Sequence, residues 1–203
     1  MQTLELAKAL EASNVNFLWV FRAPTGFITH LSSDNNNTKA ANKDDFLPTG
    51  FEDRIKASDK GLLVEKWAPQ TEILAHESVG AFLSHCGWNS MIEALSEGVP
   101  MLTWPMEGDQ PFNARFLEEE IGACVGVAEG VVSEVKCEEM VKKIQLIMKD
   151  GDDGNVMRRK ACEVREMIRN ATYDEGGRKG SSAEAMGNFV NEFLQTRKRV
   201  ELM

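Results

Sequence analysis

Residues with chemically active side chains cluster in segment 84–100, which reads SHCGWNSMIEALSEGVP. His85 and Cys86 are of the types that ligate metals, and Cys86 or Ser90 could act as a nucleophile. Gly87 followed by polar residues is also typical of a turn that lets an anion approach the backbone. Four interpretations are therefore open: a metal site, a nucleophile, a phosphate cradle, or an ordinary strand–turn–helix junction.

Ligand spacing disfavours the metal interpretation. His85 and Cys86 are adjacent, so one ion cannot easily contact both, and the chain has only 3 histidines. Structural zinc needs about four nitrogen or sulfur ligands. Segment 150–155, DGDDGN, begins like a calcium loop but lacks the closing Glu of such loops, so we predict a turn between helices there. We expect no metal site.

Local context disfavours the nucleophile interpretation. Ser90 lacks the GxSxG pattern that exposes a catalytic serine. Cys86 has His85 beside it, but neighbours on an extended chain point to opposite sides and do not pair. We therefore expect no covalent catalysis from this segment.

A phosphate cradle fits the spacing better. Gly87 would let the chain turn sharply, and Trp88, Asn89 and Ser90 would form the first turn of a helix, where N–H groups have no intrahelical partners. Free donors and the helix dipole together favour an anion. Glu93, one turn further along the same face, could accept hydrogen bonds from ribose hydroxyls. Spacing alone leaves the alternative open that Asn89 and Ser90 only cap the helix and Glu93 is a solvated charge.

Charge and composition exclude other classes of function. The 203 residues can bury one sizeable core, but a net charge of -9 disfavours nucleic acid as a partner. The basic residues 197–199 are interpreted as a solvated tail. No apolar run approaches the roughly 18 residues of a membrane span, and the acidic N-terminus is not a signal peptide. The four cysteines fit no CxxC pair, which indicates free thiols and a cytoplasmic protein: Cys86, Cys124, Cys137 and Cys162.

The elements that would position these residues alternate between strands and helices. Short apolar runs predict buried strands at 16–22, 61–67, 79–85, 100–105 and 122–128. Helical patterns predict helices at 3–13, 70–77, 89–97, 110–120, 134–149, 155–171 and 181–196. The polar stretch 32–45 is predicted to be a flexible loop. This alternation indicates an α/β fold, a doubly wound Rossmann-like parallel sheet covered on both faces, with ligands bound beyond the carboxyl ends of the strands.

The first element differs from that plan. A doubly wound sheet normally opens with a strand, and the loop after it often holds phosphate. Here a helix follows Met1 directly. We therefore expect the first strand to be missing and the chain to be N-terminally truncated.

The segment from Trp67 to Gln110, WAPQTEILAHESVGAFLSHCGWNSMIEALSEGVPMLTWPMEGDQ, closely resembles the signature box of plant secondary-product UDP-glycosyltransferases. The rest of the chain resembles the C-terminal half of such enzymes. The resemblance implies a GT-B fold of two Rossmann-like domains. Residues 1–203 would form the C-terminal UDP-sugar-binding domain, with 181–203 as its last helix and tail.

The resemblance also implies which residues bind the donor. Uracil would contact Trp67 and the Ala68 backbone, and the ribose would contact Gln70 and Glu93. The diphosphate would contact His85, Gly87, Asn89 and Ser90. The sugar would contact Trp88, Asp109 and Gln110. From the residues alone, milder interpretations stay open. Trp67 could be a core residue, as Trp104 is expected to be, Asp109 and Gln110 could only cap the next helix, and His76 is interpreted as structural.

The family transfers a sugar from a UDP-sugar to a hydroxyl of a small lipophilic acceptor, with inversion and without metal or other cofactor. Gln110 at the end of the box leans toward glucose, so UDP-glucose is the implied co-substrate. The acceptor would be a flavonoid, hormone, terpenoid or similar aglycone. The general base and most of the acceptor pocket would lie in the N-terminal acceptor domain, so we expect no catalytic residue in this chain and little or no turnover by it alone.

Two alternatives remain. The chain could be a non-catalytic UDP-sugar-binding module. A nicotinamide-dependent oxidoreductase would share the sheet, but the segment GACVGVAEG at 122–130 lacks GxGxxG spacing and does not open a helix at once. The segment GGRKGSS at 176–182 follows a helix and misses the spacing of a phosphate-binding loop.

Overall fold

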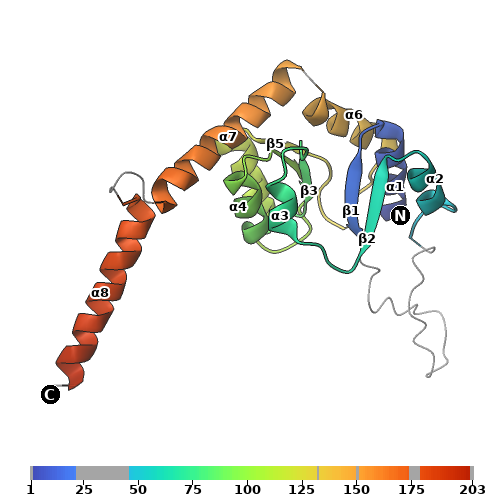
Figure 1. Cartoon of the computed structure of the whole chain (residues 1–203). Helices are drawn as coiled ribbons and strands as arrows, with labels where there is room; N and C mark the ends of the chain where they lie inside the picture. The colour runs from blue at the N-terminus through green and yellow to red at the C-terminus, as the bar shows by residue number, and fades with distance from the viewer. Residues whose placement is uncertain (1, 22–45, 132, 150, 174–178, 202–203) are drawn as a thin grey trace, which may run out of the picture.

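The computed structural model describes residues 2–21, 46–131, 133–149, 151–173 and 179–201 (Figure 1). Its elements, in chain order, are α1 (Gln2–Ser13), β1 (Phe17–Phe21), α2 (Phe51–Ala57), β2 (Gly61–Glu65), α3 (Gln70–Leu74), β3 (Phe82–Ser84), α4 (Trp88–Ser96), β4 (Met101–Thr103), α5 (Gln110–Phe116), the π-helical turn η2 (Leu117–Ile121), β5 (Cys124–Gly126), α6 (Cys137–Met148), α7 (Asp152–Thr172) and α8 (Ser181–Glu201). The predicted flexible loop at 32–45 lies outside the described residues.

The predicted strands and helices all form, which confirms the α/β class. Each strand is shorter than the apolar run that predicts it, because the run continues into turns and loops beyond the ladder. Helix α2 is not predicted by the sequence pattern. Its seven residues bury only two side chains, Phe51 and Ile55, which is too few to give a clear helical period.

All described strands pair in parallel, in two separate groups. β1 pairs with β2, with Phe17 opposite Gly61 and Phe21 opposite Glu65. β4 lies between β3 and β5, so the second group has the order β3-β4-β5. Within the described residues, no strand hydrogen-bonds to the free edge of β1 or to the free edge of β3.

The separation of the two groups follows the doubly wound scheme. In that scheme strands lie in the order 3-2-1-4-5-6, so the first strand sits between the second and the fourth. The observed orders β2-β1 and β3-β4-β5 match strands 3-2 and 4-5-6 of the scheme. The break between β1 and β3 therefore falls at the place that the scheme reserves for its first strand.

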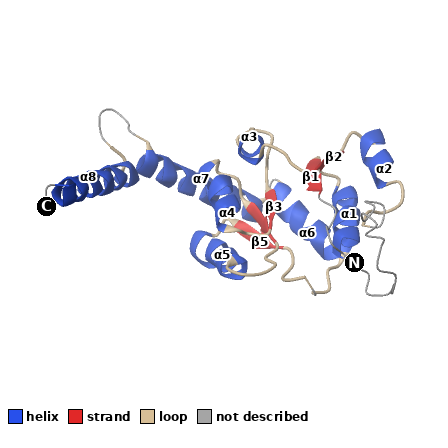
Figure 2. Cartoon of the chain, turned by 90° about the horizontal axis from the view of Figure 1, so that it is seen from below, coloured by secondary structure: helices blue, strands red, loops and turns tan. Residues whose placement is uncertain are grey.

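The β3–β5 group is covered on both faces, as predicted. Side chains of a strand alternate between faces. Met101 of β4 packs in a cluster with Met91 of α4 and Leu117 of η2. Its neighbour Leu102 packs in a second cluster that includes Leu6 of α1 and residues of α6. Figure 2 shows these helices around the central strands.

The β1–β2 group differs from the prediction, because only one of its faces is covered. Phe17 stacks on Phe51 of α2, with ring centroids 6.3 Å apart. On the opposite face, Leu18, Val20 and Leu62 are exposed. No described helix packs over that face, so these apolar side chains stay in contact with solvent.

Helix α7 packs against α4 and buries Met157 and Ala161 in the core, whereas α8 extends away from the sheets (Figure 1). Several large apolar side chains of α8 are exposed: Met186, Phe189, Val190, Phe193 and Leu194.

In the described part of the chain, no helix is both long and apolar enough to cross a membrane. All four cysteines are free thiols, as predicted.

Candidate functional site

A tight turn connects β3 to α4 at the carboxyl edge of the sheet. Cys86 makes the turn, with a left-handed backbone (φ 65°) and a fully buried side chain. A left-handed conformation costs a non-glycine residue about 1–2 kcal/mol, so other contacts must hold it. The hydroxyl oxygen of Ser84 accepts the N–H of Cys86 at 3.2 Å, which provides one such contact.

Gly87 has a different role from the one expected. Its φ of -59° and ψ of 142° are accessible to any residue, so Gly87 is not what reverses the chain. A Cβ atom at this position would lie 2.6 Å from Nε2 of His85. A side chain at position 87 would therefore displace the imidazole of His85, which packs directly over the backbone.

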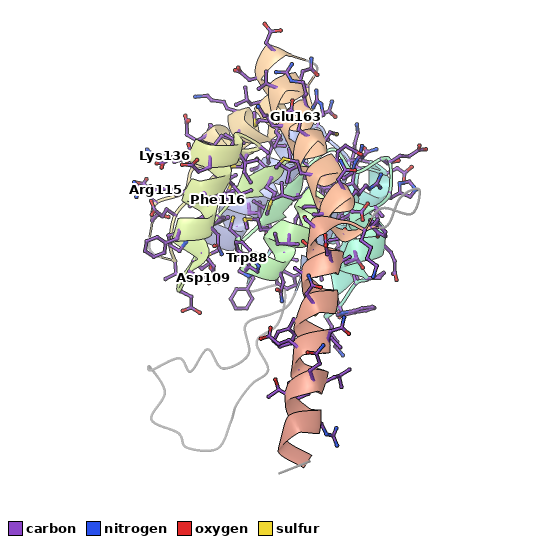
Figure 3. The ribbon with its side chains drawn as sticks, turned by 90° about the vertical axis from the view of Figure 1, so that its left-hand side faces the viewer. Trp88, Asp109, Arg115, Phe116, Lys136 and Glu163 are labelled. Atoms are coloured by element: carbon purple, nitrogen blue, oxygen red, sulfur yellow. The ribbon has the colours of Figure 1, made fainter. Side chains whose placement is uncertain are left out.

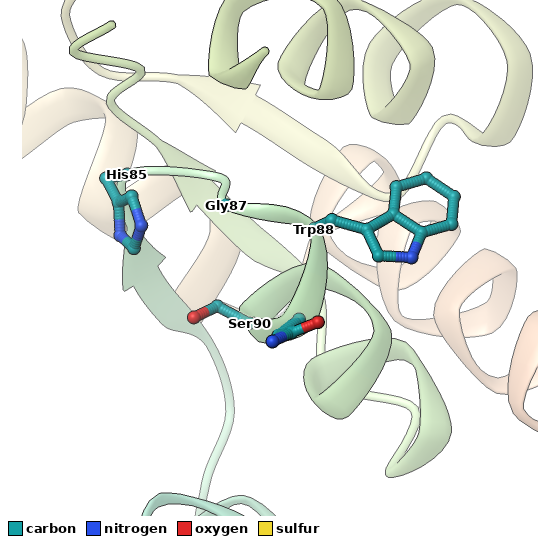
Figure 4. A pocket seen from close by; sticks show the side chains of 5 residues that line it. His85, Gly87, Trp88 and Ser90 are labelled. Carbon is teal, nitrogen blue, oxygen red and sulfur yellow. The ribbon is translucent and has the colours of Figure 1, made fainter. Parts of the chain in front are cut away.

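The N-terminus of α4 opens into a pocket. The pocket has a volume of about 360 Å³ and is lined by His85, Gly87, Trp88, Asn89 and Ser90. In Figure 4 the indole of Trp88 points away from His85, so the two side chains border different sides of the turn. Trp88 and Asp109 both lie on the face of the molecule seen in Figure 3.

The alternative that polar residues merely cap α4 is wrong. The residue at the cap position is Gly87, and no side chain makes a capping hydrogen bond. The N–H of Met91 donates to the carbonyl of Gly87 at 3.0 Å, so the three N–H groups before it have no partner within the helix. Free donors at the positive end of the helix dipole suit an anion.

Gln70 and Glu93 meet although they belong to different helices. Nε2 of Gln70, at the start of α3, donates to Oε2 of Glu93 at 2.6 Å. The same nitrogen lies 3.4 Å from Oγ of Ser90. Two residues that the resemblance assigns to ribose thus stand together, next to the pocket at the start of α4.

Asp109 and Gln110 stand at the start of α5, and the side chain of Asp109 does not cap the helix. Oε1 of Gln110 accepts the N–H groups of Met106 and Glu107 at 2.9 and 3.1 Å. This fixes the orientation of the amide, with its NH₂ group turned away from that loop as a donor. Oδ2 of Asp109 accepts an N–H of the Asn113 amide at 2.9 Å.

Two tryptophans have opposite environments. Trp67 follows β2 and is 73% exposed, so the interpretation of Trp67 as a core residue is wrong. Trp104 is 5% exposed, and its Nε1 donates to the carbonyl of Gly130 at 3.3 Å, which confirms it as a core residue. Among the described residues, Trp67 and Ala68 do not line the pocket at α4.

The cysteines near the site are poor nucleophiles. Burial raises the pKa of the Cys86 thiol to about 11 and that of Cys124 to about 12. Both thiols therefore stay protonated at neutral pH.

His76 makes a local contact, since its Nδ1 accepts the N–H of Ser78 at 3.2 Å. Within the part of the chain that the structure describes, no group of three His, Cys, Asp or Glu residues is placed to hold a metal.

A family model, described as UDP-glucoronosyl and UDP-glucosyl transferase, matches residues 2–162. The chain belongs to this family. Its α/β structure is the Rossmann-like C-terminal domain of the GT-B fold, as the sequence predicts, and its relatives are plant UDP-glycosyltransferases.

One relative of this chain is UDP-glycosyltransferase 92A1 of Arabidopsis thaliana, 46% identical over 198 residues, which cover 98% of this chain and 38% of the relative. The structure of Phytolacca americana apo UGT2 matches with a TM-score of 0.79 and 36% identity, over 94% of this chain and 40% of that chain. UGT2 complexed with UDP-2fluoro-glucose and pterostilbene matches with a TM-score of 0.77 and 35% identity, over 94% and 38% of the two chains. This chain thus spans about two fifths of the length of the relatives it matches.

The site contains one polar residue that the sequence pattern does not predict. Asn113 of α5 is 9% exposed, and its Nδ2 donates to the carbonyl of Cys86 at 3.0 Å as well as to Asp109. A buried amide one helical turn after Asp109 was the available signal. It was not recognised, because the motif that carries the resemblance ends at Gln110.

Proposed function

We propose that this chain is the donor-binding part of a UDP-dependent glycosyltransferase that transfers glucose, with inversion, to a hydroxyl of a small lipophilic acceptor. The observation that carries the proposal is the uncapped N-terminus of α4, which opens into a pocket beside His85. Membership of the family and the UDP-2fluoro-glucose bound by a relative of the same fold support a UDP-sugar as the ligand.

Each part of the donor has a proposed partner. The diphosphate would lie at the free N–H groups of Asn89 and Ser90, next to His85 and Gly87. The ribose would bind Glu93 and Gln70, which already contact each other at 2.6 Å. A carboxylate is a strong acceptor for hydroxyl donors, so this pair suits a diol.

The base and the sugar have their own proposed contacts. The exposed indole of Trp67 would stack on uracil beside the backbone of Ala68, an interaction worth about 1–3 kcal/mol per base. The sugar would lie among Trp88, the carboxylate of Asp109 and the amide NH₂ of Gln110. The amide and the carboxylate supply a donor and an acceptor for neighbouring hydroxyls.

In the proposed mechanism this chain stabilises the leaving group. As the acceptor oxygen attacks the anomeric carbon, the bond to the diphosphate breaks and negative charge grows on UDP. The helix N-terminus and the side chain of His85 would offset that charge. We assign no general base in this chain and place it in an N-terminal acceptor domain, which would also bind a flavonoid, hormone, terpenoid or similar aglycone.

The proposed compartment is the cytoplasm, because the four cysteines are free thiols and reducing compartments keep thiols unpaired. A non-catalytic UDP-sugar-binding fragment is a second candidate, since we assign no general base among the residues of this chain. A turnover assay separates the two. We expect the 203-residue chain alone to give no product above background, and a chain extended by an acceptor domain to restore transfer.

The direct test of the donor site is a titration with UDP, followed by tryptophan fluorescence. We expect quenching that saturates in the wild type and is lost in Trp67→Ala. Trp19→Phe removes an indole of the β1 core and should leave the saturable quenching in place. A folded wild type that shows no response by fluorescence or calorimetry would contradict the proposed function.

A further inference from the structure

One buried amide connects the two halves of the proposed donor site. Asn113 lies on α5, and its Nδ2 has two hydrogens to donate. One contact is to the carbonyl oxygen of Cys86, at 3.0 Å, and the other is to Oδ2 of Asp109, at 2.9 Å. Because α5 and the turn before α4 meet through this nitrogen, the distance between diphosphate contacts and sugar contacts depends on it.

The contact to Cys86 fixes the turn. Cys86 has a left-handed backbone, and the hydroxyl of Ser84 holds its N–H at 3.2 Å while Asn113 holds its carbonyl at 3.0 Å. The Cys86 carbonyl is part of the peptide unit that leads into Gly87. The Asn113 contact therefore restrains that unit, and the first N–H groups of α4 follow directly after it.

The contact to Asp109 fixes a carboxylate. Backbone geometry already joins the two residues, because the N–H of Asn113 donates to the carbonyl of Asp109 at 3.0 Å. The side-chain contact then holds Oδ2, which leaves Oδ1 as the acceptor for a sugar hydroxyl. The amide is uncharged, so it orients the carboxylate without neutralising it.

We infer that Asn113 is a positioning residue, which sets the carboxylate of Asp109 at a fixed distance from the diphosphate-binding turn. This inference rests on the proposed function. It predicts that Asn113 strengthens the binding of the complete UDP-sugar more than the binding of UDP. A side chain that only supported the fold would affect both ligands alike.

The test compares the affinities of the full chain for UDP and for UDP-glucose by calorimetry. Asn113→Asp keeps the shape of the side chain but places a carboxylate against Asp109 and against the carbonyl of Cys86. We expect the ratio of UDP-glucose affinity to UDP affinity to fall by about tenfold, the size of one hydrogen bond to a charged group. Asn155→Asp makes the same change of charge at an exposed position of α7 and should leave the ratio unchanged.

The outcomes separate this inference from the proposed function. If the wild type binds neither ligand, the proposed function is wrong and the inference is wrong with it. If the wild type binds both, and Asn113→Asp loses both affinities equally or neither, only the inference is overturned. If Asn113→Asp does not fold, Asn113→Ser, which retains a single hydroxyl donor, is measured in the same way.

A double-mutant cycle tests whether Asn113 acts through Asp109. Asp109→Ala should lower the affinity ratio by itself. In that background, Asn113→Asp should change the ratio by less than twofold, because the carboxylate that it positions is gone. Fully additive effects of the two substitutions on the ratio would overturn the inference.

Discussion

Nε2 of Gln70 lies 2.6 Å from Oε2 of Glu93, although 23 residues separate them along the chain. The contact joins the first turn of α3 to the middle of α4. It leaves the second carboxylate oxygen of Glu93 available to a ligand beside the pocket. The pair therefore predicts a specific dependence of binding on ribose hydroxyls.

Glu93→Ala should weaken UDP binding by about tenfold or more, since a hydrogen bond to a charged group is worth about 1.5–3 kcal/mol. Binding of 2′,3′-dideoxy-UDP, which lacks the hydroxyls, should change by less than about twofold. Calorimetric titration of both nucleotides provides the comparison. Glu72→Ala, at an exposed position of α3, is the matched control. Equal losses for the two nucleotides would show that Glu93 supports the fold and does not bind ribose.

Gly87→Ala should displace the imidazole of His85, because the added Cβ would lie 2.6 Å from Nε2. We expect UDP affinity to fall by about tenfold, as one charge-assisted contact to the diphosphate is lost. Gly187→Ala adds the same methyl group on α8, where nothing lies within 4 Å of it. That control should keep its UDP affinity. Its free energy of unfolding should rise slightly, because alanine in a helix interior is more stable than glycine by about 0.5–1 kcal/mol. Unchanged affinity in Gly87→Ala would contradict the role given to the close packing of His85.

The buried thiols predict a loss of stability in alkali. Burial raises the pKa of Cys86 to about 11, above its ordinary value of 9.0. The unfolded chain then releases this proton first, so the free energy of unfolding should fall as the pH rises from 9.0 toward about 11. The slope is at most about 1.4 kcal/mol per pH unit for each thiol. Cys124 contributes in the same direction.

Urea unfolding at about pH 8 and about pH 10 measures this change in the free energy of unfolding. These pH values lie about one unit below and above the ordinary pKa of a thiol. Cys86→Ala should be less stable at pH 8, because a buried side chain is lost, but should show a smaller decrease on going to pH 10. An identical decrease in wild type and variant would rule out Cys86 as the source.

Gly98 ends α4 and should tolerate substitution poorly. Its φ is 72°, and the N–H of Val99 donates back to the carbonyl of Ala94 at 2.9 Å, as in a helix-terminating glycine motif. Gly98→Ala should lower the free energy of unfolding by about 1–2 kcal/mol, the cost of a left-handed alanine. Thermal or urea unfolding measures the change. A variant as stable as the wild type would mean that the residues at the C-terminal end of α4 can adopt another conformation.

Much of the fold could be predicted from the sequence, for a physical reason. Strands of a parallel sheet are buried on both faces, so they read as continuous apolar runs, and 100–105 predicts β4 in this way. The ends of such runs are not determined, because apolar residues such as Trp104 continue into the core beyond the ladder. Helix α2 is not predicted, because its two buried residues, Phe51 and Ile55, are too few to give a clear helical period.

The sequence by itself determined the class of the protein and the identity of most candidate site residues, because the motif between Trp67 and Gln110 is long and local. Only the tertiary structure decided how they are joined. The contact of Gln70 with Glu93 spans 23 residues, and that of Asn113 with Cys86 spans 27. Such contacts depend on how helices pack on the sheet, and no local pattern in the chain encodes that packing.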